Sequence, residues 1–428
     1  MHPPISSETL RQEVKDFVDS TPVLDIHTHL YPPSFDKMYL AGIDELVTYH
    51  YLIAELFRSS SFRPADFWVM SKTQQADTIW EALFVRNTPI SEATRGVVCV
   101  MRAFGLDPGA PNLNQAREFF ASRKREDHIR DVFRLAGVSE VVMTNDAFDE
   151  VEASYWQQGA QPHPQFHAVL RLDPILNAWD TAREKMTALG YNVAEIPSHS
   201  TREARRFLDD WIARMKPLYM AVSLPPDFKY PDDSSRSELI TKVILPACLD
   251  HNLPFAAMIG VRKRVNPALR DAGDSVGHAD VAAVERMCLD HPDNRFLVTM
   301  LSRENQHELC VAARQFSNLM PFGCWWFMNN PSIISEITRE RIEMLGSSFI
   351  PQHSDARILE QVIYKWGHSR RVIADALIEG YEALQRDGWA LTSDQIRRDV
   401  DRMFQGNFRQ WAGMPAAPDL RSLTGAPA

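Results

Sequence analysis

Two histidines separated by one residue, His27 and His29, are the strongest candidates for chemistry in this sequence. They end a mostly apolar stretch, residues 23–29, that predicts a buried strand. Because alternate residues of a strand face the same side, both imidazoles would point into the same space. Two neutral imidazoles on one face suit zinc or a similar divalent ion. Such a pair also arises by chance, so two ordinary polar histidines at a strand end are the alternative.

A carboxylate late in the chain offers a third ligand. Asp355 ends the last apolar stretch, residues 347–355. Three protein ligands would leave a position open for substrate or water, which is typical of catalytic rather than structural metal sites. Two nitrogens and one carboxylate suit zinc, and they also suit manganese. The alternative is that Asp355 caps the N-terminus of the following helix.

Four further side chains are candidates for binding an anion or moving a proton. Arg171, at the end of the third apolar stretch, could clamp a carboxylate bidentately, although a lone arginine is more often a surface ion pair. Arg357, two residues after Asp355, could hold a substrate oxyanion. His50 and Tyr51 supply two proton-transfer groups if their segment folds over the site, but alone they would more often be helix-packing residues.

The ends of the middle strands lack further metal ligands. The fourth predicted strand ends without a lysine, and the fifth and sixth end without a histidine. A two-metal site needs more ligands than this, so a single metal ion is expected. Arg262, Lys263 and Arg264 follow the fifth strand, and one of the three is expected to meet an anionic substrate. His353, two residues before Asp355, is expected to pack beside the site rather than to bind the metal.

Eight apolar stretches must position these residues, and helical patterns lie between most of them. Eight strands alternating with helices predict an α/β fold, a distorted (β/α)8 barrel, whose active site lies at the carboxyl ends of the strands. We expect residues 1–29 and 140–411 to form the barrel domain and residues 30–139 to form a helical insertion over its mouth. The chain is expected to be helical again over 359–411 and frayed over 412–428. The predicted strands are 23–29, 140–146, 166–173, 219–224, 254–260, 295–301, 318–326 and 347–355.

Composition excludes several classes of protein. The 428 residues carry 46 Lys and Arg against 56 Asp and Glu, a formal net charge of −10, which argues against nucleic acid as a partner. No apolar run approaches the roughly 18 residues of a membrane helix. Five cysteines without a CxxC pair indicate reduced thiols in the cytoplasm rather than a disulfide framework. A small-molecule substrate is therefore expected, and association into a homo-oligomer stays open.

Taken together, the motifs resemble a known family. An HxH strand with an aspartate on strand eight resembles the amidohydrolase superfamily, and DIHTHL, TYHY, RLDP, GCWWF and SDAR together resemble the uronate isomerases within it. The similarity to the shorter, divergent bacterial branch runs from about residue 20 to about residue 410. It implies a distorted barrel with one divalent metal, often zinc, on His27, His29 and Asp355. Longer members carry a histidine where this chain has Met258.

The resemblance implies interconversion of D-glucuronate with D-fructuronate, and of D-galacturonate with D-tagaturonate, through an enediol. It places His50, Tyr51, Arg171 and Arg357 around the substrate. We expect the metal to polarise the carboxylate side of the sugar or the adjacent hydroxyl. Arg171 would clamp the carboxylate, and Arg357 would stabilise the enediolate.

The proton steps of this reaction fall to the remaining candidates. Tyr51 would carry the proton between C2 and C1, with its pKa lowered by Arg357, and His50 or Asp355 would move the ring-opening proton. Two other readings fit the residues alone. One is a metal-dependent hydrolase of a carboxylate-bearing amide or lactone, and the other is a barrel that only binds a sugar acid.

Overall fold

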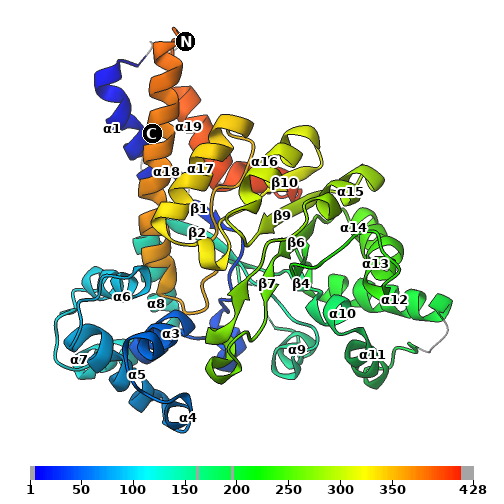
Figure 1. Cartoon of the computed structure of the whole chain (residues 1–428), viewed down its shortest axis with the longest axis horizontal. Coiled ribbons are helices and arrows are strands. Elements are labelled where there is room, and N and C mark those ends of the chain that lie inside the picture. The colour runs from blue at the N-terminus through cyan, green and yellow to red at the C-terminus, as the bar shows by residue number, and fades with distance from the viewer. Residues whose placement is uncertain (1–4, 161–162, 194–196, 416–428) are drawn as a thin grey trace.

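The computed structural model of the chain describes residues 5–160, 163–193 and 197–415 (Figure 1). Parallel strands form its centre in two hydrogen-bonded groups. The first group is β1 (Val23–Asp25), β2 (Val138–Val142) and β3 (Phe166–His167). The second, in spatial order, is β4 (Leu170–Arg171), β5 (Met220–Leu224), β6 (Phe255–Ile259), β9 (Phe296–Met300) and β10 (Leu319–Pro321).

Backbone hydrogen bonds join the two groups at the third predicted strand. That strand is interrupted between β3 and β4, and Asn145, just past β2, bridges the break. Its N–H donates to the carbonyl of Val169, and its carbonyl accepts from the N–H of Arg171. The strand order therefore runs without a gap from β1 to β10.

The eighth predicted strand is reduced to one bridge, between Ile350 and Phe322. Beyond it, the N–H of Asp355 donates to the carbonyl of His27, and the N–H of His29 donates to that of Ala356. These bonds bring the end of the eighth strand segment against the end of the first. The fold is the expected distorted (β/α)8 barrel, with its first and last strands held together at the mouth.

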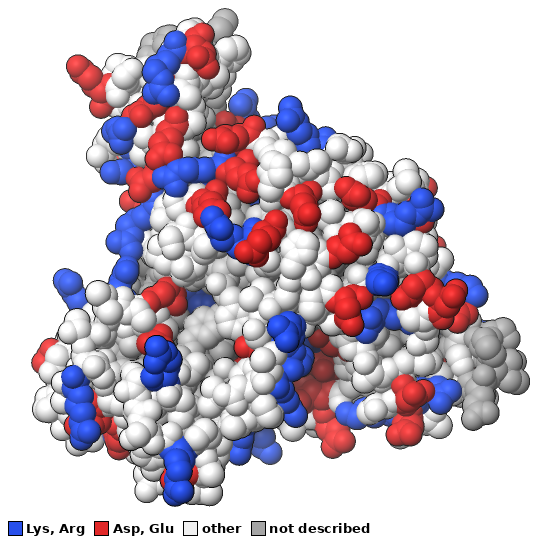
Figure 2. Space-filling model, in the orientation of Figure 1, with Lys and Arg blue, Asp and Glu red and all other residues white. Residues whose placement is uncertain are grey.

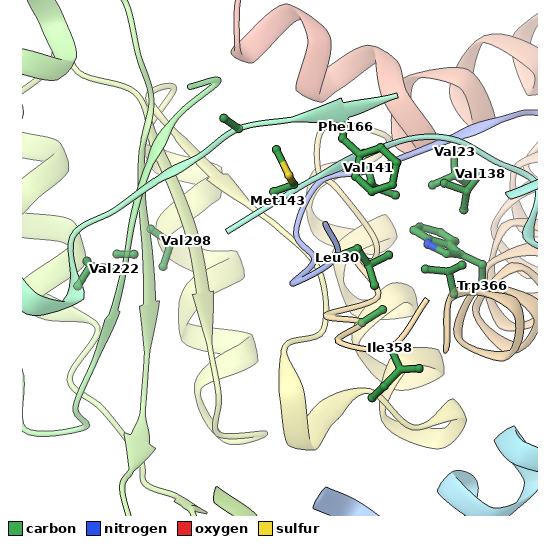
Figure 3. Close-up of a cluster of buried hydrophobic side chains, with 14 of the residues drawn as sticks. Val23, Leu30, Val138, Val141, Met143, Phe166, Val222, Val298, Ile358 and Trp366 are labelled. Carbon is green, nitrogen blue, oxygen red and sulfur yellow. The ribbon is translucent and has the colours of Figure 1, made fainter. Parts of the chain in front are cut away.

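Side chains of the central strands alternate between the barrel interior and the helical shell, as parallel strands covered on both faces require. In β6, for example, Ala256 and Met258 pack inward, whereas Phe255, Ala257 and Ile259 pack against the shell. Met258 is thus part of an apolar interior. Figure 3 shows part of the outer cluster, in which Val23, Val138, Val141, Phe166, Val222, Val298 and Trp366 are among the labelled side chains.

Helices cover the outside of the barrel. The two longest helices between strands are α12 (Pro197–Met215) and α17 (Pro331–Leu345). The others between strands are α9 (Glu150–Gln157), α10 (Asp173–Asn177), α11 (Trp179–Ala188), α13 (Ser235–Leu239), α14 (Leu245–Asp250), α15 (Ala282–Asp290) and α16 (Asn305–Gln315).

The segment between β1 and β2 is helical, as expected, and β2 begins at Val138, two residues before the predicted boundary. Gly137 ends the last of these helices at φ 65°, and a Cβ there would lie 2.6 Å from Nη2 of Arg370, so only glycine fits. The helices are η1 (Pro33–Met38), α2 (Ile43–Val47), α3 (His50–Ser59), α4 (Pro64–Phe67), α5 (Lys72–Trp80), η2 (Glu81–Val85), α6 (Glu92–Ala103), α7 (Asn114–Ala121) and α8 (Arg125–Ala136).

The C-terminal region is helical too, and its last helix packs against the barrel interior. The long helix α18 (Gln361–Arg386) lies beside α1 (Ser7–Ser20) and α17 (Figure 1), and α19 (Ser393–Asp401) and α20 (Asn407–Trp411) follow. Phe408 packs on Tyr219 in the barrel interior. Of the predicted frayed tail, residues 416–428 lie outside the described part of the chain. No helix within the described ranges has the length and apolar character needed to cross a membrane.

One element was not predicted. After β6 the chain forms an antiparallel hairpin of β7 (Val261–Arg262) and β8 (Ser275–Val276), with the short helix η4 (Pro267–Gly273) at its tip. This tip contacts α3. The hairpin therefore faces the helical insertion across the barrel mouth.

Candidate active site

The ends of the first and eighth strand segments bring His27, His29 and Asp355 together. Their candidate ligand atoms all lie within 4.8 Å of one another. Oδ1 of Asp355 lies 3.5 Å from Nε2 of His27 and 3.3 Å from Nε2 of His29. Ligands bound tetrahedrally to zinc at about 2.0–2.2 Å would be roughly 3.3–3.6 Å apart. The same Oδ1 is buried without a hydrogen-bond partner, so the three residues fit one divalent ion.

A neighbouring hydroxyl favours the imidazole tautomer that a metal needs. Oγ1 of Thr144 donates to the carbonyl of Thr28 at 2.9 Å and lies 3.4 Å from Nδ1 of His27. Since its one proton is used, this oxygen can only accept from Nδ1–H. Nε2 of His27 is then the nitrogen with the lone pair, and it faces Asp355. Sequence reasoning missed Thr144, because a threonine at a strand end carries no distinctive signal.

Asp355 stands in the left-handed region at φ 50°, which is costly for a residue with a side chain. Buried bonds to its neighbour Ser354 hold it there. The Ser354 N–H donates to Asp25 at 3.0 Å, and the Ser354 carbonyl accepts from Nζ of Lys365 at 2.7 Å. The other Asp25 oxygen accepts from Nε1 of Trp366 at 2.8 Å. Asp25 and Lys365, to which the sequence assigned no role, thus position the candidate ligand.

His353 packs beneath the site, as predicted. It is fully buried, with its ring 5.0 Å from that of His27 and 5.4 Å from that of Phe322. Gly323 lies directly against it at φ 65°, and a Cβ at this glycine would come within 1.9 Å of the His353 ring. Glycine at this position therefore leaves the room that His353 needs to support His27.

The electrostatics of the three residues suit a metal. Burial alone would raise the pKa of Asp355, but the imidazoles of His27 and His29 hold the pKa of this carboxyl well below its usual range. Burial, assisted by the positive charge of Arg357, lowers the pKa of His29 to about 3. At neutral pH Asp355 is thus a carboxylate and His29 a neutral imidazole, the forms that bind metal ions.

His50, Tyr51 and Arg357 supply further polar groups beside this cluster. Nε2 of His50 and the hydroxyl of Tyr51, at the start of α3, are buried without hydrogen-bond partners. The guanidinium of Arg357 makes no hydrogen bond or ion pair with the described residues, and its charge lowers the pKa of both His29 and His50. Unpartnered buried polar groups need an explanation, and a polar substrate would provide one.

The protonation of Tyr51, but not that of His50, differs from what the sequence predicts. Burial first, and then Arg357, lowers the pKa of His50 well below its usual value, so the ring is neutral at pH 7. The pKa of Tyr51 is raised well above 10 by burial and by Tyr49. The prediction that Arg357 lowers it was wrong, because desolvation of the phenolate dominates. Tyr51 is therefore a protonated donor at neutral pH.

Arg171 is engaged within the protein. Its Nε and Nη2 bind both oxygens of Asp173, the first residue of α10, at 2.8 and 3.0 Å. It makes no hydrogen bond or ion pair to the His27, His29 and Asp355 cluster. Nη1 has no partner among the described residues. Together with the second N–H of Nη2, it leaves one edge of the guanidinium free for a substrate carboxylate.

A largely buried acid near Tyr51, Glu92, makes the stability of the protein depend on pH. Burial raises the pKa of Glu92, on α6, to about 7, and one of its oxygens has no hydrogen-bond partner. The folded chain then holds a proton on Glu92 between about pH 4.5 and 7 that the unfolded chain loses, so the free energy of unfolding falls as pH rises through this window. Glu92→Gln should reduce the fall between pH 5 and 8 by roughly 2–3 kcal/mol.

Urea unfolding at pH 5 and pH 8 measures this difference. Glu118→Gln, on the exposed face of α7, is the matched control and should leave the fall unchanged. If the free energy of unfolding falls equally between pH 5 and pH 8 in wild type and in Glu92→Gln, then Glu92 ionises normally in the folded protein.

A distorted (β/α)8 barrel that gathers two histidines and an aspartate at the carboxyl ends of its strands is a barrel enzyme with a candidate single-metal centre. The structure superposes on a uronate isomerase of Bacillus halodurans with a TM-score of 0.94 and 53% sequence identity, covering 96% of this chain and 98% of that one. The chain belongs to the uronate isomerase family, and it is an isomerase. This membership decides against the hydrolase and the binding-only barrel that the residues alone allowed.

More distant structures share the fold. A uronate isomerase of Thermotoga maritima matches with a TM-score of 0.73 over 96% of this chain and 98% of that one. A glucuronate isomerase of Caulobacter crescentus matches with a TM-score of 0.77 over 96% and 95%. Each is 14% identical in sequence, so these two matches concern the fold alone. Comparisons with protein-family models and with curated protein sequences give no significant match.

Proposed function

We propose that this isomerase interconverts D-glucuronate with D-fructuronate, and D-galacturonate with D-tagaturonate, with one divalent metal ion held by His27, His29 and Asp355. Zinc is the first choice of metal and manganese the second. One observation carries the proposal. In a chain of the uronate isomerase family, a fitting His-His-Asp cluster lies beside buried polar groups of His50 and Tyr51 that have no partner within the protein.

The substrate is an anion, and cationic groups are available for it. The guanidinium of Arg357 is unpaired and half-buried, so it can donate to hydroxyl or enediolate oxygens of the sugar. Arg171 keeps Nη1 for the sugar carboxylate, while Asp173 fixes the plane of its guanidinium. A bound metal ion would supply Lewis-acid stabilisation of negative charge on oxygen.

Isomerisation moves one proton from C2 to C1. A second proton moves from the C2 hydroxyl to the oxygen on C1. Neutral His50 can take the proton of the anomeric hydroxyl and pass it to the ring oxygen as the ring opens, because its low pKa keeps one ring nitrogen unprotonated. The protonated Tyr51 hydroxyl can donate to the C1 carbonyl oxygen and receive the proton of the C2 hydroxyl, which returns it to its starting form. Asp355, a carboxylate at neutral pH, replaces Tyr51 as the candidate that takes the C2 proton and delivers it to C1.

Turnover of both sugars by purified protein tests this proposal. Ketouronate formation is followed by NMR in D2O, with and without a chelator, and bound metal is measured on the same sample. We expect chelator-sensitive ketose formation with about one metal per chain. If neither sugar reacts although metal is bound, the proposed substrates are wrong and other uronates become the ones to screen.

Other expectations remain predictions. They are a barrel domain of residues 1–29 and 140–411 with residues 30–139 as a separate helical unit, a hexuronate as the small-molecule partner, no nucleic-acid or membrane partner, and association as a homo-oligomer. The net charge of −10 supports the exclusion of nucleic acid. The five free cysteines support a cytoplasmic location.

A further inference from the structure

A cavity of about 570 Å³ adjoins the candidate active site between α3 and the β7–β8 hairpin. His50 and Arg357 line its inner end, whereas none of His27, His29 and Asp355 lines it. Figure 2 shows this face of the molecule hollowed between the helical insertion and the rest of the chain. Cavities of about 300–1,000 Å³ hold drug-sized ligands, so this one has more room than a single sugar ring needs.

Two arginines from the hairpin line the outer part of this cavity. Neither Arg264 nor Arg270 pairs with a carboxylate among the described residues. The guanidinium of Arg270 lies over the ring of Trp68, 4.2 Å from its centroid. Both arginines stand at positive φ, 49° and 54°, which is uncommon for residues with side chains and clusters at ligand-binding sites.

The backbone that carries these arginines is fixed. The carbonyl of Gly273 accepts from the N–H of Asn266 across the tip of the hairpin, and the N–H of Arg264 donates to Asp274. Nε1 of Trp68 donates to the carbonyl of Ala268 at 2.9 Å, which ties the hairpin to the insertion. A pre-formed loop loses little conformational entropy when a ligand binds.

The charges around the cavity favour an anion. Three guanidinium groups line it, those of Arg264, Arg270 and Arg357. Two carboxylates line it as well, but Glu45 is already paired with Lys72 at 3.0 Å. Asp271 is the carboxylate of the lining that lacks such a partner among the described residues. Positive charge is therefore in excess where the cavity leaves the active site.

We propose that this cavity is a second sugar subsite, and that the enzyme accepts an acidic disaccharide with a uronate at its reducing end. The inference rests on the proposed function. The second uronic acid ring would lie between the insertion and the hairpin, with its carboxylate on Arg264 and Arg270. The reaction is the same proton transfer from C2 to C1 of the reducing ring, so the glycosidic bond stays intact and no co-reactant is consumed.

The test compares kcat/KM for α-1,4-linked digalacturonate and for D-galacturonate. Wild-type enzyme should convert the reducing end of the disaccharide to the ketose. The Arg264→Gln/Arg270→Gln variant should lower the ratio of disaccharide to monosaccharide kcat/KM about tenfold or more, because charge-assisted hydrogen bonds to the second carboxylate are lost. Arg262→Gln is the matched control, an exposed arginine of the same hairpin outside the cavity lining, and should leave the ratio unchanged.

A second measurement checks binding without turnover. Digalacturonate reduced to its alditol cannot isomerise, and it should inhibit D-galacturonate turnover competitively in wild type and more weakly in the double variant. Turnover of D-galacturonate with neither conversion of nor inhibition by the disaccharide would overturn the second subsite alone. An unchanged ratio in the double variant would also overturn it. Failure to isomerise D-galacturonate itself would instead overturn the proposed function, and the subsite with it.

Discussion

Exchanging Asp355 for asparagine should lower turnover of both hexuronates by at least three orders of magnitude, about 4 kcal/mol of transition-state stabilisation. The amide removes the negative charge of the carboxylate, whose buried Oδ1 faces His27 and His29 without a hydrogen-bond partner. Asparagine is also among the residues best tolerated at positive φ, so the backbone at 50° should survive. Steady-state kinetics and metal content measured on one preparation check both effects.

The fold serves as the first control for this variant. Far-UV circular dichroism and the thermal midpoint should stay close to those of wild type. Asp280→Asn removes an exposed carboxylate outside the cluster and should leave turnover unchanged. Turnover of Asp355→Asn within about tenfold of wild type, less than 1.4 kcal/mol, would contradict its assignment to the metal and to the chemistry.

Replacing Arg357 by methionine should lower kcat by roughly 100- to 1,000-fold, the usual cost of removing one group that stabilises developing negative charge. The variant should fold normally, because this guanidinium has no partner among the described residues and methionine keeps the apolar part of the side chain. Its positive charge also lowers the pKa of His50. Without it, His50 should become protonated at higher pH, so the acid limb of the kcat profile should move upward in pH.

Arg357→Lys separates charge from geometry. Lysine keeps the positive charge but not the planar pair of donors, so turnover between those of wild type and Arg357→Met is expected. Near wild-type turnover in Arg357→Met would end its assignment to the reaction. If kcat falls but the acid limb stays in place, Arg357 contacts the substrate but does not lower the pKa of His50.

The strands and the candidate metal cluster could be predicted because both depend on local pattern. Parallel strands buried on two faces are apolar at nearly every position, and a histidine pair at alternate positions stays on one face wherever the strand packs. The position of Asp355 opposite that pair followed from the barrel order alone. The eighth strand was harder to predict, because its regular pairing ends at Ile350. Beyond that residue a side chain takes over, since Oε1 of Gln352 accepts from the N–H groups of Cys324 and His353.

Features that depend on tertiary contacts could not be predicted. Arg171 has the right type and place for a carboxylate clamp, but only the fold shows that Asp173 turns back to occupy two of its nitrogens. The pKa of Tyr51 depends on how completely it is buried, which no local pattern gives. The support of the Asp355 backbone by Asp25 depends on a bond between Asp25 and Ser354, which are 329 positions apart in the chain. The hairpin with Arg264 and Arg270 was missed because its two strands are only two residues long.

Titration of metal-free enzyme with zinc, and in parallel with manganese, tests the central claim most directly. Turnover of D-glucuronate and bound metal are measured after each addition. If His27, His29 and Asp355 hold one catalytic ion, turnover should rise with bound metal and level off at about one ion per chain, and Asp355→Asn should show no such rise. Full turnover by protein that retains less than about a tenth of an ion per chain, or a rise that continues to two, would contradict the single-metal isomerase.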